Sequence, residues 1–116
     1  MKFTDTLKKN YEFQRLYSKG KSAVTPYLVV YARRTRRRGN RVGFTVSTKL
    51  GKAVVRNRVR RRLREIYRLH ESELAPGADI VVVARARAVD ARYRKLEGAF
   101  LSACDRLELR KKVGPC

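Results

Sequence analysis

The residues best suited to chemistry form an arginine-rich run, RNRVRRRLREIYR, at residues 56–68. The run contains seven arginines and a single carboxylate, that of Glu65. A planar guanidinium forms paired hydrogen bonds with phosphate oxygens, whereas neighbouring arginines repel one another unless anions lie between them. A solvated helix face usually mixes both signs of charge. The run therefore predicts a surface that binds the backbone of a nucleic acid.

The same segment has the period of an amphipathic helix, which we expect to span about residues 53–73. One side carries its apolar residues: Val55, Val59, Leu63, Ile66 and Leu69. The other side carries its polar residues, with Arg60 beside them: Asn57, Arg61, Arg64 and Arg68. A helix with this pattern packs one side on a core and presents the other to a partner.

A second basic segment, RRTRRRGN at residues 33–40, contains five arginines: Arg33, Arg34, Arg36, Arg37 and Arg38. The Gly39-Asn40 pair is a turn signal between two strand-like runs, so we expect a hairpin here. Its loop either adds non-specific attraction to a polyanion or makes a structured contact with it, and the sequence leaves both open. We expect contacts weaker than those of the long helix.

Aromatic residues recur in the predicted first helix and in the strand that leads into the second basic segment. Asn10 is expected to cap a helix through Tyr17, with Phe13 on one side of it and Gly20 as its stop. In the strand predicted at residues 27–33, Tyr31 shares a face with Val29 and Arg33, while the opposite face is aliphatic. Aromatics at such spacings usually fill cores, but an exposed aromatic beside arginine also stacks on the bases of single-stranded nucleic acid.

The residues expected to carry catalysis are missing from these patterns. The single histidine, His70, falls at the apolar edge of the long helix, where a structural role is more common. Glu71 and Glu73 point in different directions on a helix, whereas a metal-dependent nuclease needs convergent carboxylates. We expect no catalytic residue and no metal site in the protein itself.

The remaining segments predict a sheet and a last helix. Alternation indicates a strand at residues 41–47, and the continuous apolar run at residues 80–84 is typical of a strand buried on both faces. After it, Asp90 is expected to cap a helix. Its apolar residues recur at three- and four-residue spacing: Tyr93, Leu96, Phe100, Ala103, Cys104 and Leu107. The order α-β-β-α-β-α predicts an α/β (α+β) two-layer sandwich with helices packed on a small mixed sheet.

Composition limits the class of protein. The 116 residues include 30 basic and 10 acidic side chains, a net charge of +20, of which residues 1–68 carry +18. This length predicts one domain, residues 1–116, and the charge predicts that this domain binds a nucleic acid. Two cysteines, Cys104 and Cys116, make no disulfide framework, and the sequence has no signal-peptide or membrane-length apolar run. We therefore expect a cytoplasmic protein with no membrane contact and no obligate protein partner.

Several segments in order resemble the bacterial ribonuclease P protein component. The most specific is RVGFTVS at residues 41–47, followed by Lys49, Gly51, AVV and the RNRVRRRLR helix, whose RNR sequence is the hallmark of that family. The opening LKKN with Glu12-Phe13 and Gly20, and residues 79–84 with Arg85, are similar to the same family. The resemblance covers nearly the whole chain.

This resemblance implies the protein subunit of a ribonucleoprotein that removes the 5′ leader of precursor tRNA. In that family the RNA subunit performs hydrolysis with bound Mg²⁺, and the protein supplies no catalytic group. The partners implied are the catalytic RNA and precursor tRNA. The residues implied to contact the RNA subunit are those of the RNR helix: Arg56, Asn57, Arg58, Arg60, Arg61, Arg64 and Arg68.

The family also grips the single-stranded leader in a cleft between its first helix and the sheet. Carried over to this sequence, the cleft is lined by Phe13, Tyr17, Val29 and Tyr31. The family fold further implies a left-handed crossover between parallel strands, against the usual rule. Two other readings remain: a ribosomal or other structural RNA-binding protein, and a DNA-compacting protein, which would bind duplex DNA as well as structured RNA.

Overall fold

The computed structural model describes residues 4–111, which form three helices and five strands. In chain order they are β1 (Thr4–Thr6), α1 (Asn10–Lys19), β2 (Lys21–Val24), β3 (Leu28–Arg34), β4 (Asn40–Thr45), α2 (Ala53–His70), β5 (Ala78–Ala84) and α3 (Tyr93–Arg106). Short 3-10 helices at Thr48–Leu50, Glu71–Glu73 and Ala86–Ala88 complete the connections. Cys116 lies outside the described residues.

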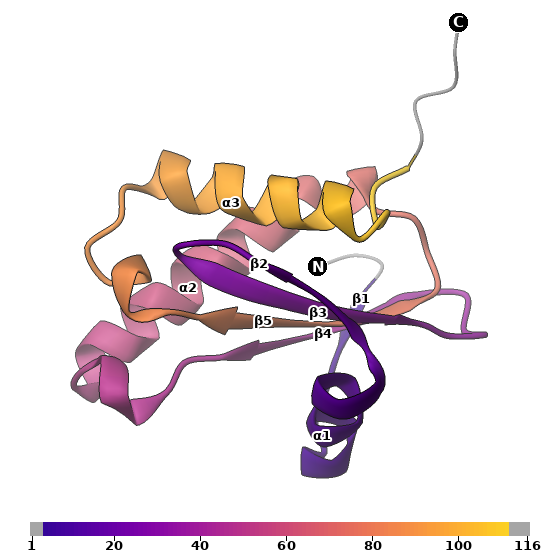
Figure 1. Ribbon diagram of the computed structural model, residues 1–116, viewed down its shortest axis with the longest axis horizontal. Helices are drawn as coiled ribbons and strands as arrows, with labels where there is room; N and C mark the ends of the chain where they lie inside the picture. The colour runs from indigo at the N-terminus through magenta and orange to yellow at the C-terminus, as the bar shows by residue number, and fades with distance from the viewer. Residues whose placement is uncertain (1–3, 112–116) are drawn as a thin grey trace, which may run out of the picture.

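The five strands form one mixed sheet in the order β1-β4-β5-β3-β2. Strands β4 and β5 are parallel and are joined through α2, whereas β3 runs antiparallel to β5. Helices α2 and α3 lie on one face of the sheet, and α1 lies on the other (Figure 1). The predicted fold class, helices packed on a mixed sheet, is confirmed, but the predicted order α-β-β-α-β-α omitted the short strands β1 and β2. The left-handed crossover stays a prediction.

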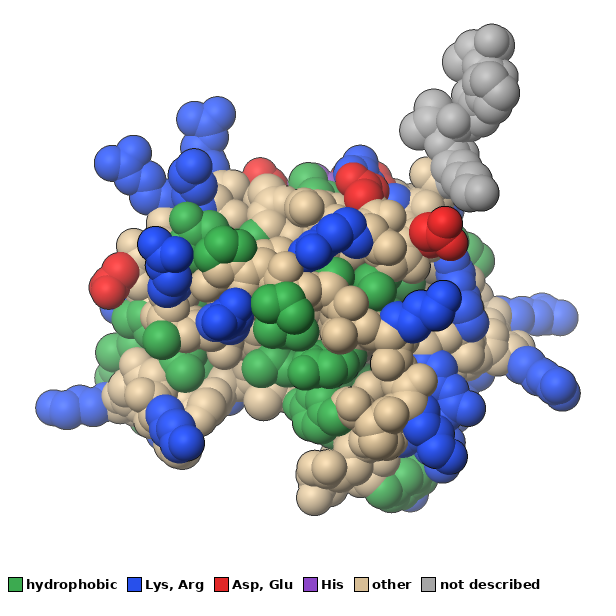
Figure 2. All heavy atoms as spheres, viewed as in Figure 1, with side chains coloured by type: hydrophobic (Ala, Val, Ile, Leu, Met, Phe, Trp, Pro, Cys, Tyr) green, Lys and Arg blue, Asp and Glu red, His purple; other side chains and the backbone are tan. Residues whose placement is uncertain are grey.

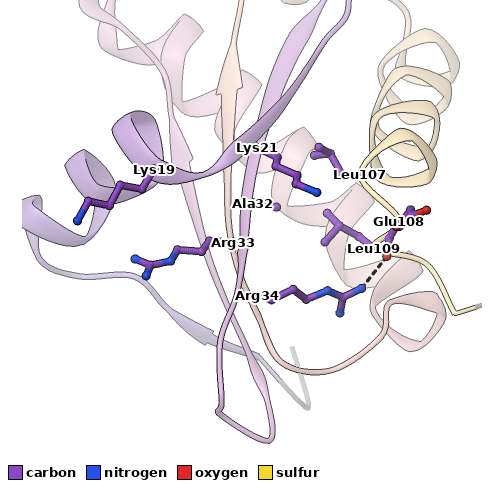
Figure 3. A pocket seen from close by; sticks show the side chains of 8 residues that line it. All are labelled: Lys19, Lys21, Ala32, Arg33, Arg34, Leu107, Glu108 and Leu109. Carbon is purple, nitrogen blue, oxygen red and sulfur yellow. Dashed lines mark hydrogen bonds between the residues drawn. The ribbon is translucent and has the colours of Figure 1, made fainter.

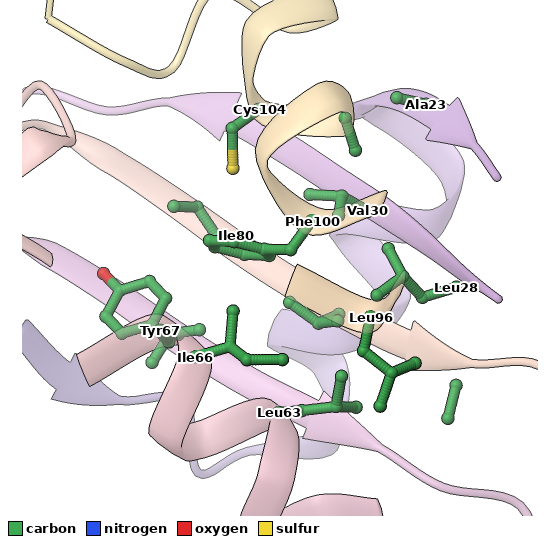
Figure 4. Packing of buried hydrophobic residues seen from close by; sticks show 14 of the residues in the cluster. Ala23, Leu28, Val30, Leu63, Ile66, Tyr67, Ile80, Leu96, Phe100 and Cys104 are labelled. Atoms are coloured by element: carbon green, nitrogen blue, oxygen red, sulfur yellow. The ribbon is translucent and has the colours of Figure 1, made fainter. Parts of the chain in front are cut away.

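The main core lies between the sheet and the pair α2 and α3 (Figure 4). The Tyr67 ring packs edge-to-face between Phe44 and Phe100, with centroids 6.2 and 6.1 Å away. Its hydroxyl lies 2.9 Å from the Thr4 hydroxyl, which joins α2 to β1. Burial raises the pKa of Tyr67 to about 12, so the ring stays neutral inside this core.

The predicted hairpin, which would pair the strands at residues 27–33 and 41–47 through the segment at residues 33–40, is wrong. Strands β3 and β4 are antiparallel to each other but do not pair, because β5 lies between them and pairs with both. The reason is burial: β5 is apolar on both faces, so the centre of the sheet is its most favourable position. The actual hairpin joins β2 to β3 through Thr25, whose side-chain oxygen accepts the N–H of Leu28 at 2.9 Å.

The N-terminal caps of two helices also differ from the sequence predictions. The N-cap of α1 is Lys9 rather than Asn10, because the Glu12 carboxylate accepts the Lys9 N–H at 3.3 Å. The N-cap of α3 is Arg92 rather than Asp90, since a hydrogen bond from Arg62 to the Ala91 carbonyl holds the preceding segment.

The buried side of α2 also differs at its edge from the predicted apolar stripe. Leu69, expected within it, is 50% exposed, and Tyr67 is buried instead. Both residues lie at edges of the stripe. The edge that faces β4 and α3 is the one that becomes covered, because Phe44 and Phe100 surround Tyr67 there.

Candidate nucleic-acid interface

The sheet face beneath α1 carries three rows of side chains that cross β3, β5 and β4 in register. The charged row is Arg33, Asp79 and Arg41; the covered row is Tyr31, Val81 and Gly43; the open row is Val29, Val83 and Thr45. Neighbouring rows are two residues apart, or about 7 Å along each strand. The first and third rows therefore lie on opposite sides of the helix that covers the second.

Helix α1 is held over the covered row by close contact with β4. A Cβ on Gly43 would lie 2.5 Å from Cε1 of Phe13, so only glycine lets this ring rest on the strand. Leu7, Leu16 and Val81 form a small buried cluster at this contact. The cluster fixes the orientation of α1 without covering the whole face.

The four residues of the expected leader cleft converge beside this cluster. Tyr17 packs edge-to-face on Tyr31 with centroids 5.0 Å apart, and its hydroxyl lies 3.0 Å from that of Thr45 in the open row. Phe13, Tyr17 and Tyr31 remain partly exposed while packing on the cluster. Val29 is partly exposed in the open row, and Figure 2 shows hydrophobic side chains exposed beside α1.

The start of α2 lies at the same end of the sheet as the open row. Strand β4 ends at Thr45, and a short 3-10 helix leads directly to Ala53. In Figure 1, α2 begins near the end of β4 and runs back toward the start of β5. The RNR sequence therefore lies at the end of the molecule toward which the aromatic surface opens.

The arginines of α2 divide into those already bonded and those free to bind. Arg56 donates to the Gly51 carbonyl and Arg60 to Asn57 Oδ1, both at 3.2 Å. Arg68 forms an ion pair with Glu65 at 2.5 Å. Within residues 4–111, three exposed arginines at three-residue spacing have no ion-pair partner: Arg58, Arg61 and Arg64. They form an uncompensated positive line opposite Val59, Leu63 and Ile66, which are buried.

The second arginine segment lies at the opposite end of the sheet. It is the connection from β3 to β4, on the far side of α1 from the open row. Arg33, Arg34, Arg36, Arg37 and Arg38 are all exposed. Arg34 alone among them donates a side-chain hydrogen bond within residues 4–111, at 2.7 Å to the Glu108 carbonyl.

Two further titratable side chains, His70 and Cys104, have pKa values shifted by their surroundings. His70 lies between Glu73 and Glu97, with its Nε2 2.9 Å from the Glu97 carboxylate. Burial lowers the pKa of His70, but hydrogen bonds to Glu97 and Glu73 outweigh burial and raise it above 6.5. Burial raises the pKa of the Cys104 thiol to about 12, which suppresses its nucleophilic form.

Residues 4–111 contain neither a cluster of metal ligands nor a helix suited to a membrane. No group of three or more His, Cys, Asp or Glu side chains is placed to hold a metal ion. No helix in that range is both long and apolar enough to cross a membrane.

Sequence reasoning missed several residues that shape this surface. The Thr45 hydroxyl forms a hydrogen bond with that of Tyr17, Val83 lies beside Val29 in the open row, and Gly43 leaves room for the Phe13 ring. The alternation of β4 and β5 placed these residues on one face, but only the pairing register brings them next to Val29 and Tyr31. Arg15 and Arg41 were also missed, because neither belongs to an arginine run.

Comparisons with known proteins agree over nearly the full length. A family model described as Ribonuclease P matches residues 1–108. The ribonuclease P protein component of Alkaliphilus oremlandii is 43% identical over 109 residues, 94% of this chain and 96% of that protein. The equivalent protein of Clostridioides difficile is 39% identical over 107 residues, 91% of this chain and 94% of that protein.

Solved structures with this arrangement belong to the same group. The RNase P protein of Staphylococcus aureus superposes with a TM-score of 0.83 at 34% identity, covering 91% of this chain and 97% of that chain. The RNase P protein of Thermotoga maritima gives a TM-score of 0.77 at 29% identity, covering 84% and 93%.

Proposed function

Because this chain belongs to the ribonuclease P protein family, we propose that it assists an RNA-based endonuclease in removing the 5′ leader of precursor tRNA. One observation carries the proposal: partly exposed aromatic side chains gather on the α1 face of the sheet, and α2, which begins beyond the end of β4 where the open row lies, carries a line of exposed arginines without ion-pair partners among residues 4–111. A stacking surface suits a single strand, and an arginine line suits the backbone of a folded RNA.

In this proposal the leader lies along the open row between α1 and the start of α2. Its contacts are Phe13, Tyr17, Val29 and Tyr31. Stacking on aromatic rings ignores base identity, so leaders of different sequence are bound. Mature tRNA lacks this strand, and the contacts therefore favour substrate over product.

The RNA subunit is proposed to bind the exposed side of α2. The three unpaired arginines are the strongest candidates, and the full set comprises Arg56, Asn57, Arg58, Arg60, Arg61, Arg64 and Arg68. Arg68 contributes least while Glu65 neutralises it. The arginines at residues 33–38 are proposed to make weaker RNA contacts.

Hydrolysis is assigned to the RNA subunit and its Mg²⁺. Two carboxylates that hard cations would favour, those of Glu12 and Asp79, both bind Arg41 instead. The donor set of residues 4–111 does not fit a resident Mg²⁺ site. The protein acts by binding and orienting RNA, in the cytoplasm.

The proposal is tested by cleavage of a 5′-extended precursor tRNA at low Mg²⁺ with a bacterial ribonuclease P RNA. We expect this protein to stimulate cleavage at the mature 5′ end and to cleave nothing alone. The same RNA with a precursor that has a one-nucleotide leader is the control, because that substrate cannot fill the open row. Absence of stimulation with a matched RNA would favour a ribosomal or other structural RNA-binding protein.

The α2 contact is tested by the salt dependence of RNA-subunit binding. Replacing Arg60, Arg61 and Arg64 with Gln should lower the log–log slope by about 2 to 3, since each phosphate contact releases about one counterion. An unchanged slope would remove this side of α2 from the interface. Equal competition by duplex DNA would instead favour the DNA-compacting alternative.

A further inference from the structure

A hollow of about 650 Å³ lies on the side of α1 away from the open row. Its lining includes Arg15 from α1, Arg33 and Arg34 from the end of β3, Arg36 and Arg37 from the connection, and Arg41 from β4. Among residues 4–111, Asp79 is the only acidic residue of the lining. We call the group Arg15, Arg33, Arg36, Arg37 and Arg41 the basic hollow.

Two carboxylates beside this hollow, those of Glu12 and Asp79, are already bound to Arg41. Arg41 donates to both oxygens of Asp79 at 3.0 and 2.7 Å and also forms an ion pair with Glu12. Hydrogen bonding to Asp79 raises the pKa of the Arg41 guanidinium further. Two carboxylates thus hold the Arg41 guanidinium in place, and the positive charges of the other arginines in the hollow remain uncompensated.

Four arginines of the hollow have no ion-pair partner within residues 4–111: Arg15, Arg33, Arg36 and Arg37. Like charges gathered around a concave surface raise its positive potential and lower the stability of the free protein. An anion removes this repulsion. Figure 2 shows Lys and Arg side chains gathered at this end of the molecule, around α1 and the β3–β4 connection.

The basic hollow continues into two neighbouring hollows, which suits a chain of anions better than a single ion. Arg37 and Arg41 also line a hollow of about 510 Å³ with Lys8 and Lys9, where the four basic side chains outnumber the two acidic ones, Asp5 and Glu12. On the other side, Arg33 and Arg34 line a pocket of about 370 Å³ with Lys19 and Lys21 (Figure 3). Arg33 points to the α1 side of β3, whereas Arg34 points toward Glu108.

An exposed aromatic ring lies on the same helix as Arg15. Tyr11 is 58% exposed, and its ring centroid lies 6.0 Å from the Arg15 guanidinium carbon and 5.8 Å from the Lys9 ammonium. A tyrosine at this exposure packs on no core. Flanked by two cations, it offers a base a stacking surface beside a phosphate site.

We propose that the basic hollow binds the sugar–phosphate backbone of an RNA segment other than the leader in the open row, with a base stacked on Tyr11. Helix α1 separates the two sites, because the charged and open rows lie on its opposite sides, about 13 Å apart along each strand. The backbone comes either from the RNA subunit or from a distal part of precursor tRNA. The proposal rests on the proposed function only in taking RNA as the polyanion.

The test compares a hollow variant with a matched charge control. The hollow variant replaces Arg15, Arg33 and Arg37 with Gln; all three are exposed, and none of their side chains donates a hydrogen bond within residues 4–111. The control replaces Arg92, Arg94 and Lys95 with Gln, which removes the same charge from the exposed start of α3. Circular dichroism verifies that each variant folds, and Arg33→Gln alone serves if the triple variant does not.

Binding of each variant is measured over a KCl series with a ribonuclease P RNA and, separately, with precursor tRNAs carrying a long or a short leader. The hollow variant should lower the log–log slope by about 2 to 3 for one of these RNAs, or by about 1 for Arg33→Gln alone. A change with the RNA subunit assigns the backbone to it, and a change only with the long leader assigns it to the precursor. Slopes equal to those of the control with every RNA would overturn the proposal.

Two further variants separate this site from the proposed function. Tyr11→Ala should weaken the same RNA complex roughly five- to a hundredfold without changing the slope, because stacking releases no counterions. Tyr31→Ala should leave the slope loss of the hollow variant intact. If the cleavage test fails but the slope loss remains, the proposed function is wrong and the basic hollow stands.

Discussion

The two faces of the sheet use similar residues for different purposes. On one face, Ile80 and Val82 of β5 are fully buried beneath α2 and α3. On the other, Val81 is buried but Val83 stays partly exposed, because the ten-residue α1 crosses the strands and covers only the middle row. One face therefore holds the fold together. The other exposes aromatic and basic residues on either side of a single helix.

The largest effect that separates the faces is expected from Phe100→Ala. This ring is buried against Tyr67 in the main core, so its loss leaves a cavity and should cost about 3 to 5 kcal/mol of unfolding free energy. Val83→Ala, on the partly exposed row, should cost clearly less. Urea denaturation measures both. Equal losses would mean that the α1 face is as much a core as the other.

Gly43→Ala examines how α1 is held on its face. The new Cβ would meet the Phe13 ring at 2.5 Å, so the ring and α1 must shift, at a cost of about 1 to 3 kcal/mol. Gly98→Ala in α3 is the matched control, because no atom lies within 4 Å of its Cβ position. That change should stabilise the protein by roughly 0.5 to 1 kcal/mol. Thermal unfolding giving the same sign for both would refute this account of the contact.

Tyr31→Ala examines the binding role of the α1 face. It should weaken precursor tRNA binding by about 1 to 3 kcal/mol, the contribution of one stacked base. Binding of mature tRNA, measured in parallel, should not change because that RNA has no leader. Equal weakening of both complexes would point to a folding defect and would break the contrast between the faces.

The smallest expected effect is the pH dependence of unfolding that arises from His70, on the face of the sheet covered by α2 and α3. The pKa of His70 is raised in the folded protein by Glu97 and Glu73 despite burial, so protonated His70 stabilises the fold. This stabilisation is complete below about pH 6.5, the ordinary pKa of histidine, and is lost as pH rises through the folded value. Urea midpoints between pH 6 and 8 should therefore fall in the wild type and flatten in His70→Gln. An identical pH profile in the variant would exclude this role.

The recognisable parts of the site were local in sequence. The period of α2 set its arginines opposite Val59, Leu63 and Ile66, and the alternation of β3 set Tyr31 and Val29 on one face. Both are properties of a single element, so nearest-neighbour geometry was sufficient. The hairpin prediction failed because pairing of β3 with β5 depends on competition among strands far apart in the chain. The α3 cap was mispredicted for a similar reason, since Arg62 contacts Ala91 from a distant segment. The α1 cap was mispredicted although its contact is local, because Glu12 lies only three residues from Lys9.

The sequence alone determined the charge of this protein, the faces of its helices and strands and its family resemblance, because these depend on residue type and period. Only the tertiary structure decided which side chains share a row, which arginines have no ion-pair partner, and where the arginines of α2 and the basic hollow lie relative to the sheet. The apolar β5 takes the centre of the sheet, and that choice separates β3 from β4, aligns Arg33 with Arg41 across Asp79 and places α1 between two surfaces. Burial of one strand thus fixed the arrangement that no single segment encodes.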